Sequence, residues 1–316
     1  MRTNQLASVL SISQAKPAGR RVPTVQGAVD EWLLDRQGFK NLSKQTIHWY
    51  RERIRYLVQL VGQERVVTDV ELEDVRRLLV DSRTRGNADV TVDSLFRAAR
   101  AFTRWCFRQG WPMDVRLLWM EPPIIGGERE VEIFTADQVR QLQEAWADNL
   151  RNLFMCNLLL GTGIRLSELI GLQVDDRHQD QIEVRWQTSK GRKTRWPPLS
   201  TRLQRDWLRY VERDRPPVGG EKQLLLRADG KRLTKWGVEK AFDTLEQRTG
   251  IHCNPHRFRH TFATWYCRKH FEEGLPLDLE RLRLILGHER YDLLPVYVHL
   301  ARQDVLVKDW DRVAPY

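Results

Sequence analysis

The sequence has 316 residues, of which 41% are hydrophobic and 30% charged. That length accommodates about two domains, each with a core of its own. Lys and Arg number 52 against 42 Asp and Glu, and the resulting formal charge of +10 favours a polyanionic partner such as nucleic acid. No apolar run reaches the roughly 18 residues of a membrane span, and the basic first residues lack the apolar core of a secretory signal. We therefore expect a cytoplasmic protein that does not contact membranes.

Residues 1–22 show no sustained periodicity and predict a basic flexible arm, which would either contact DNA or remain a disordered terminus. Residues 23–120 predict a small all-helical domain. Ser43 is placed to cap one helix, and Thr68 with Glu71 has the pattern of a capping box before another. Apolar positions recur at helical spacing in three stripes: Ile47, Tyr50, Ile54, Leu57, Val58 and Val61; Val75, Leu78 and Leu79; and Leu95, Ala99, Phe102 and Cys106.

Basic residues follow the exposed side of the last stripe, at Arg97, Arg100, Arg104 and Arg108. Such a row can track a DNA phosphate backbone, but charges opposite an apolar stripe are equally typical of a solvated helix face. Both interpretations stay open at this point.

The segment 121–132 combines two prolines, two glycines and a charged run, and predicts an interdomain linker. The second domain, residues 133–300, opens with Thr135 and Gln138 in the pattern of a capping box. A tail over residues 301–316 follows it. The four cysteines lie in apolar or helical contexts without C-x-x-C spacing and predict buried, reduced thiols, at Cys106, Cys156, Cys253 and Cys267.

Between residues 181 and 198 the helical period gives way to alternation. Ile182, Val184 and Trp186 alternate with polar residues before the basic turn 190–193. This pattern predicts a β-hairpin, so the second domain is expected to be helical with one small antiparallel sheet.

Several short stretches of this domain carry candidate chemistry. Arg165 follows the turn Gly161-Thr162-Gly163 and stands three residues before Glu168, which by itself predicts an ordinary helix ion pair. Asn254-Pro255 is a helix start, so His256 and Arg259 should share one helix face. The spacing of His252, His256 and His260 could suggest a metal site, but Pro255 interrupts their common face and Arg257 and Arg259 disfavour a cation, so no metal is predicted. His288 follows a possible helix C-cap at Gly287, and Tyr297 stands beside valines; each alone is typical of a structural residue.

Together and in this order, Arg165, Lys190, His256, Arg259, His288 and Tyr297 resemble the tyrosine recombinase family, the lambda-integrase type of site-specific DNA recombinase. The stretches TGIRLSEL, SKGRKTRWPPL, HRFRHTFAT, LGH and VYVH match the motifs of that family. The resemblance covers roughly residues 24–300. It implies a mainly α fold with an N-terminal all-helical core-binding domain and a C-terminal α+β catalytic domain.

The resemblance also implies an enzyme and a mechanism. Tyr297 would attack the DNA phosphate to form a 3′-phosphotyrosine, with Arg165 and Arg259 on the phosphate oxygens and no metal, ATP or other cofactor. His256 would accept the phenol proton, Lys190 would protonate the leaving 5′-oxygen, His288 would bind the phosphate and Glu168 would orient its neighbours. The partners would be a double-stranded recombination site and further copies of the chain in a tetramer. DNA contacts are expected at Arg97, Arg100, Arg104, Arg192 and Lys193.

Two features depart from the family pattern. The 28 residues from His260 to His288 exceed the usual spacing, and the extra HFEEGLPLDLE stretch predicts a surface insertion. Leu293 and Leu294 replace the paired threonines that commonly precede the tyrosine. The apolar tail residues would pack either on a neighbouring protomer or on their own domain; they are Leu300, Val305, Leu306, Trp310 and Val313.

Integration or excision of a mobile element is the expected role, with resolution of chromosome or plasmid dimers as the alternative. Three other classes compete: a topoisomerase with the same tyrosine chemistry, a catalytically inactive DNA-binding accessory protein, and a metal-dependent hydrolase.

Overall fold

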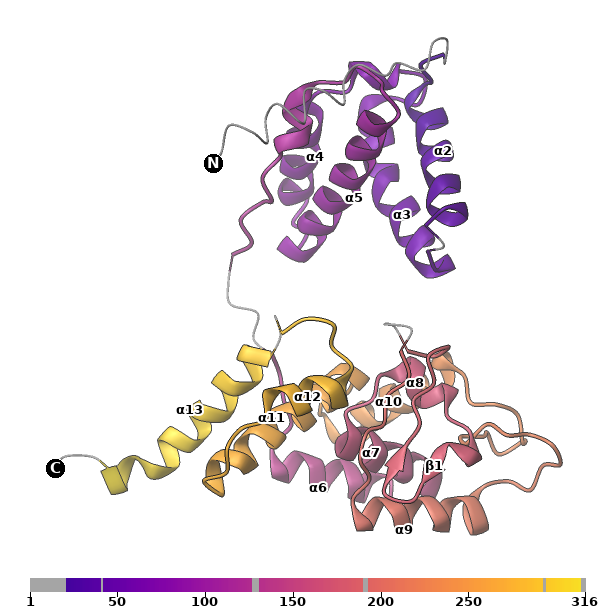
Figure 1. The fold of residues 1–316 in the computed structure, drawn as a ribbon, viewed down its shortest axis with the longest axis vertical. Helices are drawn as coiled ribbons and strands as arrows, with labels where there is room; N and C mark the ends of the chain where they lie inside the picture. Colours follow the sequence, from indigo (N-terminus) through magenta and orange to yellow (C-terminus); the bar gives the residue numbers. More distant parts are fainter. Residues whose placement is uncertain (1–20, 41, 127–130, 190–192, 292–293, 314–316) are drawn as a thin grey trace. The chain divides into compact units, whose positions relative to one another are not determined.

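A computed structural model describes residues 21–40, 42–126, 131–189, 193–291 and 294–313, with side chains up to Gln303 in the last range. Contacts divide the chain into unit 1, up to Glu128, and unit 2, from Arg129 onward (Figure 1). The predicted linker, 121–132, spans this division. The predicted arm lies almost entirely outside the described residues.

Unit 1 contains four α-helices in its described part: α2 (Val25–Gly38), α3 (Lys44–Val61), α4 (Leu72–Thr84) and α5 (Asp89–Arg108). A 3-10 turn, η2 (Val67–Asp69), lies between α3 and α4, and another, η3 (Val115–Trp119), follows α5. The helices enclose one apolar core, in which the Trp32 ring meets the rings of Tyr50 and Phe102 at centroid distances of 4.9 and 5.4 Å.

The helix starts of unit 1 follow the sequence in one case and depart from it in another. Ser43 caps α3 by accepting the Thr46 N–H, as predicted. The predicted box of Thr68 and Glu71 is wrong by one turn, because α4 begins after Glu71 and Asp74 accepts the Glu71 N–H. Thr68 instead lies in η2, where the chain turns before the helix.

Unit 2 starts with α6 (Ala136–Ala145), which Thr135 and Gln138 cap reciprocally as predicted. Its other helices are α7 (Leu150–Thr162), α8 (Leu166–Gly171), α9 (Thr201–Arg209), α10 (Lys235–Thr249), α11 (Pro255–Glu272), α12 (Leu279–Leu286) and α13 (Leu294–Val313). A 3-10 turn, η4 (Val174–Asp176), precedes the strands, and a π-helical turn, η5 (Tyr210–Asp214), extends α9. Helix α11 packs against both α7 and α13, which lets it connect the main core of the unit to a smaller core around Tyr297 (Figure 1).

The sheet of unit 2 is smaller than the sequence suggests. Strands β1 (Arg177–His178) and β2 (Gln181–Ile182) pair antiparallel, and single bridges continue the ladder at Gln181–Pro198 and Val184–Arg195. Trp186 does not continue the predicted alternation, because the ladder ends at Val184 and a turn follows, leaving the indole 52% exposed.

The stretch predicted as a surface insertion forms a loop over residues 273–278, exposed except at Leu277, and its two ends belong to the flanking helices. Its first residues extend α11 to Glu272, and its last residues begin α12 at Leu279. Phe271 and Leu277 pack against the smaller core around Tyr297, and the Arg302 guanidinium of α13 lies 5.5 Å from the Phe271 ring centroid. The added residues therefore support the helix that carries Tyr297.

All four cysteines are buried and unbonded to one another, in agreement with the prediction of reduced thiols. No helix in the described part of the chain is both long and apolar enough to cross a membrane.

Glycines end α7 and α10 in the left-handed conformation, with φ of 61° at Gly163 and 67° at Gly250. An added Cβ at Gly163 would lie 2.4 Å from Cδ1 of Phe262, whereas nothing lies within 4 Å at Gly250. Gly163 is therefore required both by its backbone and by the close packing of α11, but Gly250 by its backbone alone.

We predict that Gly163→Ala lowers the free energy of unfolding by about 2–4 kcal/mol, because left-handed strain and overpacking add. The matched variant Gly250→Ala should cost about 1–2 kcal/mol from strain alone. Calorimetric unfolding of the full chain measures both. Equal losses in the two variants would contradict the tight approach of α11 at Gly163.

Candidate active site

Arg259 lies on the first turns of α11, in the buried interior, with 3% of its surface exposed. The helix starts as predicted, with Asn254 as N-cap and Pro255 at the first position. The two terminal nitrogens of Arg259 donate to the carbonyl oxygens of Gly163 and Leu286, each over 2.6 Å. Burial, followed by repulsion from Arg165 and Arg195, lowers the pKa of Arg259 to about 9, so it remains cationic at neutral pH. The side chain is thus fixed between the ends of α7 and α12.

Arg165 stands just before α8, at the end of the turn that Gly163 opens. Its Nη2 donates to the Gly287 carbonyl over 3.0 Å, and its Nη1 pairs with Glu168 Oε1 at 3.1 Å. The predicted Arg165–Glu168 ion pair is present, but it lies inside the unit, since Glu168 is fully buried and the Arg165 side chain is 17% exposed.

A third guanidinium completes this cluster, and it comes from the hairpin. Arg195 is 8% exposed; its Nη2 lies 2.5 Å from Glu168 Oε2 and its Nη1 donates to the Ile285 carbonyl. Burial alone would raise the pKa of Glu168, but the charge of Arg195, then the Arg165 N–H and guanidinium, hold it below its ordinary value. Glu168 is therefore an ionised carboxylate shared by two arginines.

The last turn of α12 organises all three arginines. Three consecutive carbonyl oxygens, those of Ile285, Leu286 and Gly287, accept from Arg195, Arg259 and Arg165 in turn. A helix C-terminus leaves its last carbonyl groups without intrahelical partners and carries a partial negative charge, so it favours cations. Gly287 has φ of 63°, and an added Cβ would lie 2.8 Å from Cδ and Nε of Arg195. The Leu-Gly-His motif thus ends a helix and makes room for Arg195.

Tyr297 lies on the first turns of α13 and is 1% exposed. Its hydroxyl lies 3.0 Å from Nδ1 of His260, a contact that the sequence did not predict. Burial raises the pKa of Tyr297, against the opposing effect of Arg259 and then Arg165. The phenol therefore lies within the electrostatic reach of both phosphate-binding candidates, but it is protonated and enclosed in this structure.

The two other predicted histidines differ in position. His256 is exposed, and its ring lies 6.4 Å from that of His260, so His260 stands between it and the phenol. His288 is half-buried, and its buried Nδ1 has no hydrogen-bond partner among the described residues. Burial, then the charges of Arg259, Arg165 and Arg195, lower the pKa of His288 to about 4. His288 is therefore neutral at pH 7.

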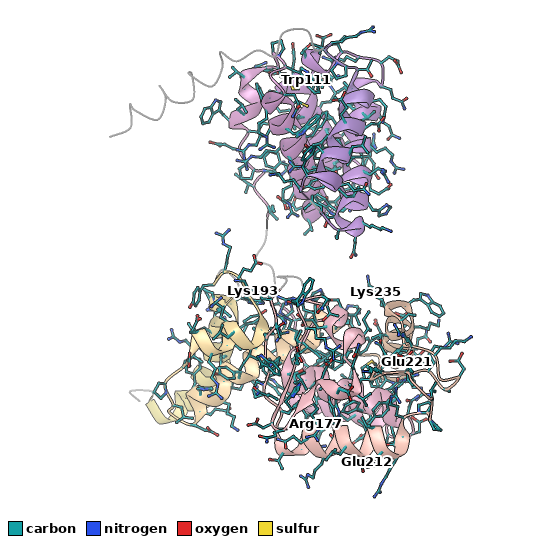
Figure 2. The ribbon with its side chains drawn as sticks, turned by 45° about the vertical axis from the view of Figure 1, so that its right-hand side comes forward. Trp111, Arg177, Lys193, Glu212, Glu221 and Lys235 are labelled. Atoms are coloured by element: carbon teal, nitrogen blue, oxygen red, sulfur yellow. The ribbon has the colours of Figure 1, made fainter. Side chains whose placement is uncertain are left out.

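The predicted residues of the hairpin turn, Lys190 and Arg192, lie outside the described residues. Lys193 is exposed at one edge of unit 2, the edge that also carries Lys235 (Figure 2). Arg177 and Glu212 lie at the opposite edge in the same view. Trp236, which follows Lys235 in the sequence, is 72% exposed.

The predicted basic row in unit 1 lies on α5. Arg97, Arg104 and Arg108 are exposed and Arg100 is half-buried. Arg97 pairs with Asp93 at 3.0 Å and lies 5.8 Å from the Trp49 ring centroid of α3. Burial, then repulsion from Arg100 and Arg108, lowers the pKa of Arg104.

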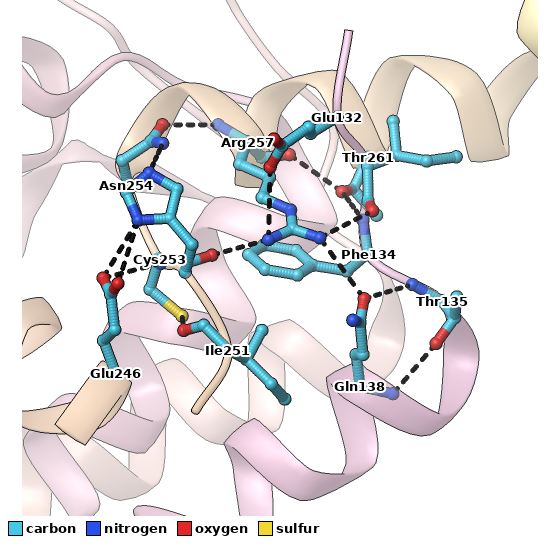
Figure 3. A network of polar contacts seen from close by, with 12 residues as sticks. Glu132, Phe134, Thr135, Gln138, Glu246, Ile251, Cys253, Asn254, Arg257 and Thr261 are labelled. Atoms are coloured by element: carbon cyan, nitrogen blue, oxygen red, sulfur yellow. Dashed lines mark hydrogen bonds and ion pairs between the residues drawn. The ribbon is translucent and has the colours of Figure 1, made fainter. Parts of the chain in front are cut away.

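Arg257 belongs to a separate, structural network (Figure 3). Its guanidinium donates to the carbonyls of His252 and Ile133 over 2.7 and 3.2 Å, and it lies 4.4 Å from the Phe134 ring centroid. The network fastens the first residues of unit 2 to the start of α11. His252 pairs with Glu246, away from His256 and His260, and no cluster of three His, Cys, Asp or Glu in the described residues could hold a metal ion.

Sequence reasoning missed Arg195 and the role of His260. Arg195 did carry a signal: it alternates with exposed residues and shares the buried face of the hairpin with Pro197 and Leu199. A buried arginine requires a charged or carbonyl partner. His260 carried no such signal, because only the packing of α13 on α11 brings Tyr297 to it.

Comparisons with known proteins agree with this geometry. The sequence model of the Phage integrase family matches residues 132–304. Tyrosine recombinase XerC of Alcanivorax borkumensis is 29% identical over 287 residues, 86% of this chain and 89% of the relative. The XerC of Serratia marcescens is 30% identical over 289 residues, 88% of this chain and 91% of the relative. A lambda integrase tetramer bound to a Holliday junction gives a TM-score of 0.71 at 14% identity, covering 92% of this chain and 80% of that one.

The structural likeness places the fold with the integrases and confirms the predicted fold class. The chain belongs to the phage integrase family, because the family model matches more than half of it and full-length relatives agree. It is a tyrosine recombinase, as the motifs indicated, and thus an enzyme of the site-specific DNA recombinase class.

The histidines of this site predict a pH dependence of stability. Burial, then the charges of His256 and Arg259, lower the pKa of His260 to about 4, and His288 also falls to about 4. In the unfolded chain these histidines bind protons below about pH 6.5, whereas in the folded chain they stay neutral down to about pH 4. The free energy of unfolding therefore decreases as pH falls from about 6.5 toward 4.

The variant His260→Gln should therefore show a shallower loss of stability over that range than the parent protein. Urea unfolding of both proteins at several pH values tests this. Between pH 7 and 8, where the histidine is neutral in both states, the two slopes should agree. Identical slopes below pH 6.5 would contradict the burial of His260 as a neutral ring.

Proposed function

We propose that the chain cleaves and rejoins duplex DNA at a specific site through a 3′-phosphotyrosine at Tyr297. The observation that supports this most directly is the convergence of Arg165 and Arg259 on adjacent carbonyls, those of Gly287 and Leu286, within electrostatic reach of the Tyr297 phenol. Residues from the turn between α7 and α8 and from α11, α12 and α13 meet there. Such a cluster can bind one phosphate and offer it a nucleophile.

The two arginines act as the phosphate clamp. In each arginine, both terminal nitrogens donate one hydrogen bond to a protein acceptor. Because a guanidinium group carries five N–H bonds, donors remain for the non-bridging oxygens of a phosphate. Their contacts to the protein fix the forks in place before DNA binds. Charge that builds up on the phosphate in the transition state therefore meets donors that need no rearrangement.

Proton transfer involves three further residues. As the Tyr297 oxygen forms its bond to phosphorus, its proton passes to His256, the exposed ring beside His260, because the phenol must leave His260 to reach DNA. The bond from phosphorus to the 5′-oxygen breaks, and Lys190 supplies the proton to that oxygen. His288 donates a ring N–H to the phosphate. The ester keeps the energy of the broken bond, so a second 5′-hydroxyl can attack it without ATP.

The buried phenol implies a conformational step. With 1% of its surface exposed, Tyr297 cannot reach a DNA phosphate in this arrangement. The first turns of α13 must therefore shift when DNA binds, which opens the contact with His260. A negatively charged phosphate near the arginines would also raise the pKa of both neighbouring histidines and make them better proton acceptors.

DNA would contact the basic edge of unit 2, where Lys193 and Lys235 lie (Figure 2), and the basic row on α5 of unit 1, at Arg97, Arg100 and Arg104. Unit 1 would serve as the core-binding domain. Four copies would assemble on two duplexes, as the lambda integrase tetramer does on its Holliday junction. The enzyme would act on the nucleoid in the cytoplasm, and α13 would carry the tail toward its own domain or a neighbouring protomer.

Integration or excision of a mobile element is the role we propose first, in line with the integrase fold. Resolution of replicon dimers is a second candidate, favoured by the full-length similarity to XerC proteins. The two roles differ in the DNA that becomes attached to Tyr297. Sequencing of trapped DNA would show the ends of an element in the first case and a single chromosomal or plasmid site in the second.

We predict that Tyr297→Phe binds the recombination site normally but forms no covalent adduct with a nicked suicide substrate, because the phenyl ring retains the packing and lacks the nucleophile. Gel retardation measures binding and denaturing electrophoresis measures the adduct. An adduct in this variant would assign the nucleophile elsewhere.

The same assay separates the competing classes. A wild-type chain that binds DNA without an adduct would be an accessory protein, and relaxation of supercoils without recombinant product would indicate a topoisomerase. Loss of cleavage in excess EDTA would indicate a metal-dependent hydrolase.

We further predict that Arg165→Lys folds normally but cleaves about 10²- to 10³-fold more slowly, since a lysine keeps the charge and loses the second directed donor. Arg202→Lys, on the exposed face of α9, is the matched control and should cleave at the parent rate. Near-normal cleavage by Arg165→Lys would remove the clamp role from this residue.

A further inference from the structure

Arg195 has contacts that exceed what a hairpin needs for its own stability. Its bridge to Val184 already fixes the strand, through backbone hydrogen bonds in both directions of 2.9 and 3.2 Å. The side chain then runs past Gly287 to reach Glu168 and the Ile285 carbonyl, both in the arginine cluster. Its Nε is buried and has no partner among the described residues. A buried charge with an unpaired donor lowers the free energy of unfolding, so its presence here points to a role in the site.

The contact with Glu168 divides one negative charge between two arginines. Oε1 of the carboxylate faces Arg165 and Oε2 faces Arg195, at 3.1 and 2.5 Å. Arg259 makes its contacts to carbonyl oxygens instead. Three guanidinium groups with one carboxylate leave two positive charges in the cluster, ready for an anion. Without Arg195, the carboxylate would act on Arg165 and Arg259 alone, and one positive charge would remain.

We propose that Arg195 is a positioning residue of DNA cleavage: by sharing Glu168 with Arg165, it keeps the charge of Arg165 available to the scissile phosphate. The inference rests on the proposed cleavage function. Arg195 does not contact the phosphate; it sets the electrostatic potential at Arg165, which does, and the orientation of the Arg165 guanidinium. Gly287 is part of the arrangement, because a side chain there would displace Arg195 from the carboxylate.

The test compares single-turnover adduct formation on a saturating nicked substrate for three variants. Arg195→Met removes the charge and keeps the bulk; cleavage should slow by about 10- to 100-fold, with little change in the Kd for DNA. Adding Glu168→Gln to Arg195→Met restores two positive charges to the cluster, and cleavage should recover by about tenfold. Arg195→Lys, with the charge retained and the fork lost, should fall between the parent and Arg195→Met.

The matched control is Arg185→Met. Arg185 lies in the same hairpin and pairs with the buried Asp176 at 2.5 Å, outside the arginine cluster. Its loss should lower the melting temperature and leave the cleavage rate of the folded protein unchanged. If Arg195 only stabilised the hairpin, the double variant, with one more contact removed, would cleave no faster than Arg195→Met.

Three outcomes decide the matter. Slow cleavage by Arg195→Met with recovery in the double variant supports the proposal. Parent-rate cleavage by Arg195→Met, or no recovery in the double variant, overturns it. Absence of an adduct with the wild-type chain would instead overturn the proposed function. Should Arg195→Met fail to fold, Arg195→Lys alone and combined with Glu168→Gln provides the same comparison, because the lysine still occupies the buried position.

Discussion

The end of helix α12 is the constraint on which the site depends. Three successive carbonyl groups there face three guanidinium groups that come from different elements, and one buried carboxylate, Glu168, binds two of them. Arginines repel one another when they are brought together without water, and their assembly needs compensating negative charge. Backbone carbonyls supply part of it without neutralising the cluster. The site therefore stays positive as a whole while each of its members is held in place.

Arginines from distant parts of the sequence meet in the site because they bind the same short segment at the end of α12. Arg165 comes from a turn after α7, Arg259 from the start of α11 and Arg195 from the hairpin, but each ends at one residue of the same short segment. Tyr297 is brought to the cluster by α13, which packs on α11. The nucleophile is thus held by a helix–helix contact, whereas the arginines are held by carbonyl groups at the end of α12.

Much of the fold could be predicted from sequence, because its signals are local. Ser43, Thr135 and Asn254 cap helices where the pattern placed them, since a cap depends on residues within one turn. Expectations failed where distant packing decides. The ladder stops before Trp186, and two residues of the predicted insertion, Phe271 and Leu277, pack on the apolar core around Tyr297. The contact between Tyr297 and His260 joins residues 37 positions apart, and no local pattern encodes it.

The acceptors for the three arginines are main-chain atoms, and this has a consequence for how the sequence can vary. No side-chain replacement along α12 removes a carbonyl oxygen, so the helix can drift in composition while the clamp persists. Leu284, which is 56% exposed on this helix, is free to change in that sense. Selection should act instead on the length of the helix and on the residue that ends it, because a shift by a single position would present a different set of oxygens. The same three carbonyl oxygens thus fix the positions of the arginines and make those positions insensitive to side-chain replacements on α12.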